Sequence, residues 1–390
     1  MRVLLAFDKF KHALGAAEAC AAVAAALRDL APTDEIDEAP LTDGGEGFAE
    51  ILTRAAGGKL LRRQVLGPRF APVEAGYGEV ELEKIPAAAR ARLDVSDHGR
   101  LVILEMAQAS GLDLLAPAAR DPWLTSSYGT GQLLGHAADT SARAVLLGVG
   151  GSATNDLGLG ALEAVGLEFR GADGAPLTRV TPARFGDILR LAGETWPHLP
   201  DLRIACDVAN PLTGPNGATA IFGPQKGLAR EDFPRLERAV GTMAKKLCAH
   251  FDQPRTLMME KGAGAAGGIA FGLSVACAAR LTPGFALVSD WLRLDERVRA
   301  ANLVITGEGR FDAGSLAGKG PGAVAALALR HGKKLIVLAG AVDEPAAAAL
   351  RAQATDGRAQ IHALSQPGEP EEISHPATAA RLAAKIKEIL

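Results

Sequence analysis

Paired cysteines, a basic excess and long apolar runs are all missing from this sequence. Its 390 residues contain four widely spaced cysteines (Cys20, Cys206, Cys248 and Cys277) and no C-x-x-C pair. This usage favours a reduced, cytoplasmic protein over a disulfide-stabilised one. The 42 basic and 45 acidic residues leave a net charge of −3. The chain therefore lacks the electrostatic surface typical of nucleic-acid binding, and no nucleic-acid partner is expected.

The apolar runs are too short or too rich in glycine to suggest a membrane protein. Residues 3–7 form an apolar run of only five residues, which is too short for the core of a signal peptide. Residues 262–279 run for 18 residues without a charge, which nominally reaches transmembrane length. Five of those residues are glycines, however. We expect a buried helix entered through a glycine loop, and no membrane partner.

Several common catalytic motifs are also missing. The nearest approach to a P-loop, residues 314–320 (GSLAGKG), is one residue short and has glycine where the metal-binding hydroxyl belongs. The eight histidines are scattered without an H-E-x-x-H pattern, so zinc chemistry has no support. No G-x-S-x-G nucleophile elbow occurs.

Short apolar runs alternate with helical patterns along most of the chain, which is typical of an α/β protein. Residues 2–7 (RVLLAF) predict a buried strand and residues 16–30 an alanine-rich helix. Residues 59–83 differ, because their period of two indicates antiparallel strands. Further strands are predicted near residues 35–39, 101–106, 144–147, 202–207, 303–306 and 335–338.

The two ends of the chain share the same style of βα unit, which predicts that they form one domain together. We expect a doubly wound, largely parallel, Rossmann-like sheet domain from residues 1–68 and 286–390, interrupted by a second α/β domain over residues 69–285. Ligands of such sheets bind beyond the carboxyl ends of the strands. Ligand sites are therefore expected beyond those strand ends.

Four glycine loops precede predicted helices, at residues 128–131, 148–156, 262–268 and 318–320. Because a helix N-terminus carries partial positive charge and free N–H donors, each loop is a candidate anion site. Four such loops together favour a polyphosphate ligand. Residues 262–267 (GAGAAG) also fit G-x-G-x-x-G, with Asp290 at a tolerable distance for a ribose contact. An NAD-dependent hydroxy-acid dehydrogenase therefore remains an alternative.

Carboxylates and basic residues stand beside these glycines or follow predicted strands. The clearest example is residues 307–320 (GEGRFDAGSLAGKG), in which Glu308 and Asp312 flank Arg310. Such acids supply metal ligands or a general base, and the nearby Lys and Arg neutralise phosphate charge. Phosphoryl transfer requires that combination. The same pattern recurs at Asp8 with Lys11, at Asp43 with Glu46, and at Asp207.

Nine stretches between about residues 8 and 340 resemble the bacterial type I glycerate kinases, the glycerate 2-kinases, in family order. They are FKHAL, TDGGEG, AQASGL, TSSYGTGQL, GVGGSATND, CDVANPLTGPNGATAIFGPQKG, GAGAAGG, NLVITGEGRFD and GKGPGAVA. The resemblance implies a two-domain α/β enzyme with its active site in the cleft between the domains. It also implies that the enzyme transfers the γ-phosphoryl group of ATP to the 2-hydroxyl of D-glycerate with Mg²⁺, giving 2-phosphoglycerate and ADP. Lys9 and His12 depart from the family pattern and put the substrate preference in doubt.

The resemblance and the residue types together suggest a role for each site residue. Asp207 is the first choice for the catalytic base and Asp43 the second. Arg310 and Lys11 are expected to hold the glycerate carboxylate or the moving phosphoryl group, with Asp8 in the same substrate site. The remaining candidates are the nucleotide-binding residues Gly150, Gly151, Ser152, Asn155, Lys226, Gly264, Gly267 and Lys319, and the metal ligands Asp312 and Glu46. Glycerate is the expected small-molecule partner, and a homodimer is a possible assembly.

Overall fold

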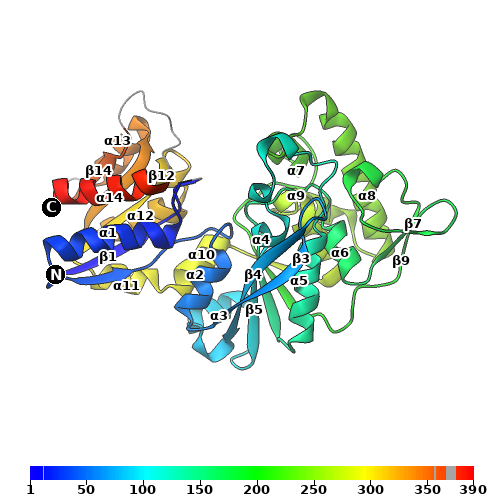
Figure 1. The fold of residues 1–390 in the computed structure, drawn as a ribbon, viewed down its shortest axis with the longest axis horizontal. Coiled ribbons are helices and arrows are strands. Elements are labelled where there is room, and N and C mark those ends of the chain that lie inside the picture. Colours follow the sequence, from blue (N-terminus) through cyan, green and yellow to red (C-terminus); the bar gives the residue numbers. More distant parts are fainter. Residues whose placement is uncertain (12, 355–356, 366–374) are drawn as a thin grey trace. The chain divides into compact units, whose positions relative to one another are not determined.

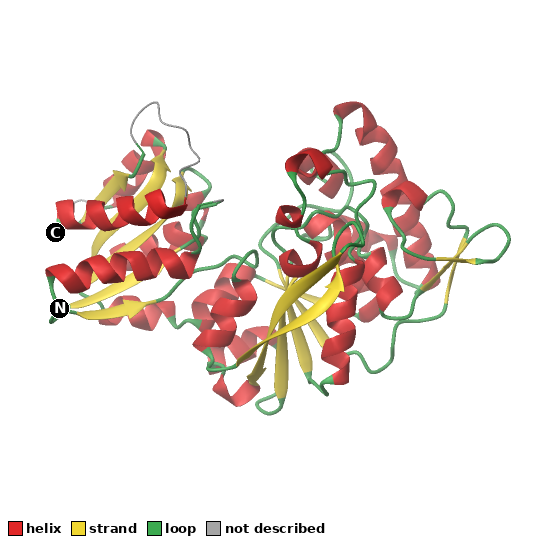
Figure 2. Cartoon of the chain, viewed as in Figure 1, coloured by secondary structure: helices red, strands yellow, loops and turns green. Residues whose placement is uncertain are grey.

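The computed structural model describes residues 1–11, 13–354, 357–365 and 375–390; the departure at His12 lies outside them. The chain forms two compact units, one from residues 1–43 and 288–390 and the other from residues 44–287. Figure 2 shows that both contain helices and strands. The predicted boundary at residue 68 differs from this division. The strand Lys59–Leu66 lies in the second unit because it pairs with a strand of that unit's sheet.

The unit formed by the two ends of the chain contains a five-stranded sheet in which every pairing is parallel. The strand order is β14-β13-β12-β1-β2, which is the order of a flavodoxin-like, doubly wound sheet. The predicted fold class is confirmed. Its elements are β1 (Arg2–Phe7), α1 (Ala16–Leu30), β2 (Glu35–Glu38), α11 (Leu294–Ala300), β12 (Leu303–Phe311), α12 (Gly320–Arg330), β13 (Lys334–Val342), α13 (Glu344–Gln353), β14 (Ala359–Ala363) and α14 (His375–Ile389).

The direction of winding reverses between β1 and β12, because β2 follows β1 outward on one side and β13 follows β12 on the other. The helices α1 and α14 pack side by side (Figure 1). With alternate residues of β1, namely Val3, Leu5 and Phe7, they form one buried apolar core. In doubly wound sheets ligands bind at such a reversal, beyond the carboxyl ends of the strands. Here that position follows Phe7 and Gly307, which are register partners.

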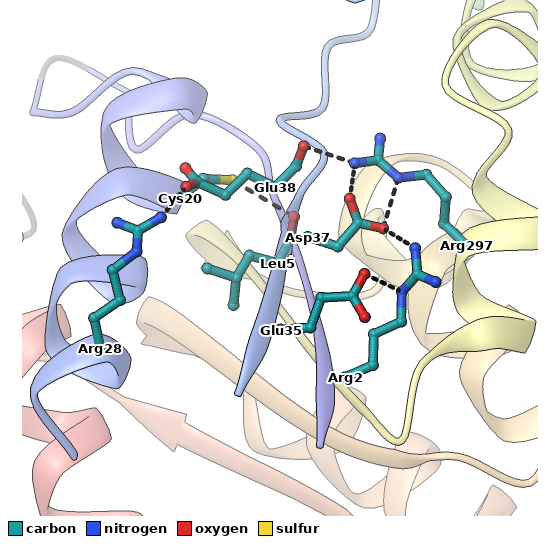
Figure 3. Close-up of polar contacts among 8 residues, drawn as sticks. All are labelled: Arg2, Leu5, Cys20, Arg28, Glu35, Asp37, Glu38 and Arg297. Atoms are coloured by element: carbon teal, nitrogen blue, oxygen red, sulfur yellow. Dashed lines mark hydrogen bonds and ion pairs between the residues drawn. The ribbon is translucent and has the colours of Figure 1, made fainter. Parts of the chain in front are cut away.

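A cluster of ion pairs fixes α11 to β2 in the same unit (Figure 3). The guanidinium of Arg297 bonds both carboxylate oxygens of Asp37, with Nε at 3.1 Å from one of them, and donates to the carbonyl of Glu38 at 2.8 Å. Arg2 lies 3.5 Å from the same carboxylate. Although burial opposes it, the bonding from Arg297 lowers the pKa of Asp37.

The second unit is built on a six-stranded mixed sheet in the order β11-β10-β6-β5-β4-β3. The first four of these strands are parallel, and β4 and β3 add to them in antiparallel fashion, as the period of two in residues 59–83 predicts. The elements from its start to the sixth strand of the chain are α2 (Phe48–Ala55), β3 (Lys59–Leu66), β4 (Pro72–Glu81), α3 (Ala87–Leu93), β5 (Arg100–Glu105), α4 (Met106–Ser110), α5 (Tyr128–Asp139) and β6 (Ala144–Gly148).

The rest of the second unit covers this sheet and adds a small antiparallel one in the order β8-β7-β9. The uncharged run at residues 262–279 forms a 13-residue helix, α9, which is largely buried. Among the described residues no helix is long and apolar enough to cross a membrane. The remaining elements are α6 (Leu159–Ala164), β7 (Glu168–Arg170), β8 (Pro176–Leu177), β9 (Arg190–Ala192), β10 (Asp201–Ala205), α7 (Ala218–Phe222), α8 (Phe233–His250), α9 (Ala265–Cys277), β11 (Arg280–Thr282) and α10 (Gly284–Trp291).

Candidate active site

The glycine loop at residues 148–156 follows β6 in the second unit and is held from two directions. The N–H of Gly150 donates to the carbonyl of Gly44, and the N–H of Leu112 donates to the carbonyl of Gly151. A Cβ on Gly150 would lie 2.5 Å from the Cα of Gly45, so a side chain here would separate the two segments. The glycine is needed for this close approach of backbones.

The same loop ends in a fully buried carboxylate. Asp156 accepts hydrogen bonds from the N–H and hydroxyl of Ser127 at 2.7 and 2.8 Å, and from the N–H groups of Gly158 and Gly160 at 3.1 and 3.3 Å. Burial raises the pKa of Asp156, and these hydrogen bonds oppose the shift. The carboxylate thus ties the segment before α5 to the loop before α6.

Lys226 approaches the glycine loop from the interior of the unit. Its Nζ donates to Ser152 Oγ at 3.0 Å and to the carbonyl of Thr154 at 2.6 Å, and the residue is 1% exposed. Burial lowers the pKa of Lys226 to about 7, while the charge of Asp156 opposes the shift. The ammonium bonds the loop itself, so we infer that Lys226 positions the residues expected to surround a nucleotide.

The segment at residues 262–268 packs against this loop from the other side. Ala266, Gly267 and Gly268 adopt left-handed conformations in succession, with φ of 52°, 73° and 91°. The carbonyl of Gly267 accepts a hydrogen bond from the N–H of Leu157, and a Cβ on Gly267 would lie 2.1 Å from the carbonyl oxygen of Thr154. Glycine is required here both for its φ and for its lack of a side chain.

The dinucleotide interpretation of this segment needs a strand directly before it. The structure has a 3₁₀-helix there, at Arg255–Met259. The G-x-G-x-x-G spacing therefore lacks the strand–loop–helix context of a dinucleotide-binding motif. Nothing in the part of the chain that the structure describes supports the dehydrogenase alternative.

Asp207 lies just beyond β10, as predicted. Its Oδ2 accepts a hydrogen bond from the backbone N–H of Phe285 at 2.8 Å, in the first turn of α10. A carboxylate in this position satisfies a helix N–H that has no partner within its own helix. The contact gives Asp207 a structural role that its place in the sequence does not indicate.

The first unit holds a separate group of charged side chains at the reversal point of its sheet. Asp8 and Glu308 directly follow the register partners Phe7 and Gly307, and the N–H of Asp8 donates to the carbonyl of Gly307 at 2.9 Å. The electrostatic neighbours of Glu308 include Asp8, Asp312 and Lys11. The last paired residues of β1 and β12 are thus followed by a pair of carboxylates with a lysine nearby.

Arg310 lies near the carboxyl end of β12, and Asp312 directly follows that strand. The Oδ1 of Asp312 accepts the N–H of Gly314 at 2.7 Å, and its Oδ2 lies 3.9 Å from Nε of Arg310. Within the described residues no three His, Cys, Asp or Glu side chains are grouped so as to hold a metal ion. Magnesium is commonly held by one or two carboxylates together with substrate phosphates. The half-exposed Asp312 fits that mode as the single protein ligand.

The predicted nucleotide residues divide unequally between the two units. Lys319 belongs to the first unit, where it precedes α12; a Cβ on the adjacent Gly320 would lie 3.4 Å from Oδ2 of Asp8. The other seven nucleotide-binding candidates lie in the second unit, in the loops already described: Gly150, Gly151, Ser152, Asn155, Lys226, Gly264 and Gly267.

Two further candidates are exposed. Asp43, the second choice for the catalytic base, belongs to the first unit, and Glu46, a metal-ligand candidate, belongs to the second.

Two features of the site are not evident from the sequence. The sequence presents Glu308 only as a neighbour of Arg310, whereas the structure has it one residue beyond Gly307, the register partner of Phe7. Its position after the apolar run at residues 303–306 is the available signal. Asp156 belongs to the motif at residues 148–156, and nothing in its spacing indicates that it bonds Ser127.

Comparison with known proteins agrees across sequence and structure. The model of the Glycerate kinase family matches residues 3–390. The glycerate kinase of Haemophilus influenzae is 38% identical over 347 residues, which cover 88% of this chain and 87% of that protein. The glycerate 2-kinase of Escherichia coli K12 is 36% identical over 355 residues, covering 88% and 86%.

A solved structure is similar over the full length. The crystal structure of a protein assigned as glycerate kinase 2 from Salmonella typhimurium LT2 superposes with a TM-score of 0.70 at 33% identity. The match covers 100% of this chain and 98% of that one.

Proposed function

Because this chain belongs to the glycerate kinase family, we propose that it transfers the γ-phosphoryl group of ATP to the 2-hydroxyl of D-glycerate, forming 2-phosphoglycerate and ADP. One observation carries the proposal. The loops that contain the family motifs of the second unit are bonded to one another around residues 148–156, with the ammonium of Lys226 beneath them. Backbone N–H groups of glycine loops and a nearby cation form a general site for polyphosphate.

In this proposal the glycine loops of the second unit hold the nucleotide. Gly150, Gly151 and Ser152 form the outer turn of the loop after β6, and Gly151 is exposed. Gly267 packs against Thr154 and Asn155 of the same loop, and Gly264 packs against Pro211 and Ala218. Asn155 is fully buried and its amide donates to Thr219 Oγ1 at 3.2 Å, so it supports the loop, as Lys226 does.

The charged group of the first unit holds the acceptor. Arg310 is an exposed cation near the carboxyl end of β12, and Lys11 is an exposed cation beyond the end of β1. They suit the carboxylate of glycerate or the equatorial oxygens of the moving phosphoryl group, since Arg can grip such oxygens in two places. Phosphoryl transfer depends mainly on this kind of positioning and charge neutralisation.

Magnesium is part of the proposal as the partner of ATP. When bound to the phosphates, the ion neutralises the charge of the transferring group. Asp312 is the protein carboxylate best placed to hold it, with Glu46 as the second candidate. A cytoplasmic location fits the cysteines, which are all unpaired, and sedimentation will test the proposed homodimer.

The product distinguishes this activity from that of a 3-kinase. With ATP, Mg²⁺ and D-glycerate, an assay coupled through enolase should give signal without phosphoglycerate mutase, because enolase acts on 2-phosphoglycerate. Phosphorus NMR of the product provides an independent check. Signal that appears only after mutase is added would identify 3-phosphoglycerate and refute the proposed regiochemistry.

Thermal unfolding tests the cofactor class. A ligand that binds only the native state raises the melting temperature. At a concentration roughly 100 times its dissociation constant, it adds about 2.7 kcal/mol to the free energy of unfolding. MgATP should produce such a shift, and NADH should not. A shift with NADH and none with MgATP would instead favour the dehydrogenase assignment.

A further inference from the structure

A pair of carboxyl groups stands at the reversal point of the first unit's sheet. Asp8 follows β1 and Glu308 continues β12, one residue beyond the register partners Phe7 and Gly307. The strands are hydrogen-bonded to each other at this point through the N–H of Asp8 and the carbonyl of Gly307. Rigid strand ends hold these two side chains more precisely than a loop would.

One oxygen of this pair has no partner in the described structure. Oε1 of Glu308 is buried and makes no hydrogen bond. Leaving a buried carboxylate oxygen unsatisfied costs free energy. Such an atom is suited to receive a proton or a hydroxyl donor from a ligand.

The charges around the pair also favour proton uptake. Burial raises the pKa of Glu308 to about 7, helped by the negative charges of Asp8 and Asp312 and opposed by Ser315 and Lys11. Burial and the charge of Asp43 raise the pKa of Asp8 to about 6, against the N–H and charge of Lys9 and the charge of Lys11. A general base works best when its pKa lies near the operating pH.

We propose that Glu308 is the proton acceptor of the reaction and that Asp8 positions it; this inference rests on the proposed kinase function. As the hydroxyl oxygen of glycerate bonds to the γ-phosphorus, the bond from that phosphorus to the bridging oxygen of ADP breaks. The hydroxyl proton passes to Oε1 of Glu308 and later to solvent. Asp8 keeps a negative charge beside Glu308 and so maintains its affinity for the proton.

The other candidate carboxylates are less suited to this role. Oδ2 of Asp207 accepts a hydrogen bond from the backbone of Phe285, and Asp43 is exposed. A metal-ligand role for Glu308 is disfavoured, because the cation Lys11 is among its electrostatic neighbours.

The test compares Glu308→Gln, Glu308→Asp and the control Glu344→Gln, which removes an exposed charge paired with Arg351. Glu308→Gln keeps the size of the side chain but cannot accept the proton. We expect its kcat to fall by about 10²–10⁴-fold, with KM for ATP and glycerate changed less than about threefold. The control should match the wild type.

The pH profile supplies a readout that a structural role would not give. In the wild type, kcat should fall as the pH drops below about 7, because a protonated Glu308 cannot act as a base. The acid limb belongs to the Asp8–Glu308 pair as a whole. The residual activity of Glu308→Gln should lose this limb, whereas Glu308→Asp should keep it at a lower rate.

Each other outcome overturns a defined part of the inference. If kcat of Glu308→Gln stays within tenfold of the wild type, Glu308 is not the acceptor. If calorimetric titration shows that MgATP affinity collapses while kcat at saturation is kept, Glu308 is a ligand residue. Should Glu308→Gln fail to fold, the rate and pH profile of Glu308→Asp decide. A wild type that is inactive toward glycerate would refute the proposed function itself.

Discussion

The substitution Lys226→Met removes an ammonium that is almost fully enclosed by protein. Lys226 is 1% exposed, and its Nζ bonds Ser152 Oγ and the carbonyl of Thr154. Burial lowers its pKa from 10.5 to about 7, against the opposing charge of Asp156. Between these two pH values the unfolded chain still holds a proton that the folded chain has released.

This difference sets the sign and size of a pH effect on stability. Because the unfolded state binds more protons between about pH 7 and 10.5, Lys226 makes the free energy of unfolding rise with pH in that window. One pKa unit corresponds to about 1.36 kcal/mol, so from pH 7 to 9 the rise is about 2 kcal/mol. The Met variant lacks this contribution, and all other groups titrate alike in both proteins.

Calorimetric unfolding at pH 7 and pH 9 measures the free energy of unfolding of the wild type and of Lys226→Met. At pH 7 the stabilities should be similar. Removing a buried charge is favourable, but the oxygens of Ser152 and Thr154 each lose a donor, at about 1–3 kcal/mol. At pH 9 the free energy of unfolding of the wild type minus that of Lys226→Met should exceed the same difference at pH 7 by about 2 kcal/mol. Lys245→Met, at an exposed position of α8, is the control.

Equal pH dependence in the wild type and Lys226→Met would refute the reasoning, because it would mean that the ammonium is hydrated in the folded protein. The same variant should raise KM for MgATP more than it lowers kcat, since the loop at residues 148–156 loses an anchor. A variant with normal KM would separate Lys226 from nucleotide binding altogether.

Three further substitutions test the other contacts. Arg310→Lys should lose much of kcat/KM with unchanged melting temperature, because lysine cannot grip an anion in two places; near-normal steady-state kinetics would make Arg310 a surface residue. Asp207→Asn keeps an oxygen for the N–H of Phe285, so its kcat should fall less than about tenfold, against about 10²–10⁴ for a lost base. Arg297→Met leaves Asp37 without its bidentate partner and should cost about 3 kcal/mol in chemical denaturation. Its control Arg28→Met breaks an exposed pair and should cost less than about 1 kcal/mol.

The sequence predicts individual elements well where one pattern dominates. The alanine-rich run forms α1 at Ala16–Leu30, and the apolar run RVLLAF forms the buried β1. The period of two in residues 59–83 correctly indicates an antiparallel pair. That period cannot tell which sheet the pair joins, because pairing is decided by a distant strand. The predicted boundary at residue 68 therefore differs from the division after residue 43, since β3 reaches the six-stranded sheet through β4.

The candidate site is predictable only as a set of residues near glycine loops. Glycine marks where backbones approach, and Gly150 and Gly267 do lie at such points. The direction of a side chain is different, since it depends on packing from remote segments. Lys226 therefore bonds the loop from within, and Asp207 bonds the first turn of α10, although both look in sequence like residues facing a ligand.

The strand order explains why the sequence alone does not single out Glu308 as the proton acceptor. Asp8 and Glu308 lie at opposite ends of the chain, and each alone is an acid after an apolar run. Only the order β12-β1-β2 places β12 beside β1, and only the register Phe7 to Gly307 places the two carboxyl groups together. Besides burial, the negative charge of Asp8 then raises the proton affinity of Glu308. The acid–base chemistry we propose is thus a property of the sheet topology, and it will be absent from any variant in which β1 and β12 fold but shift in register.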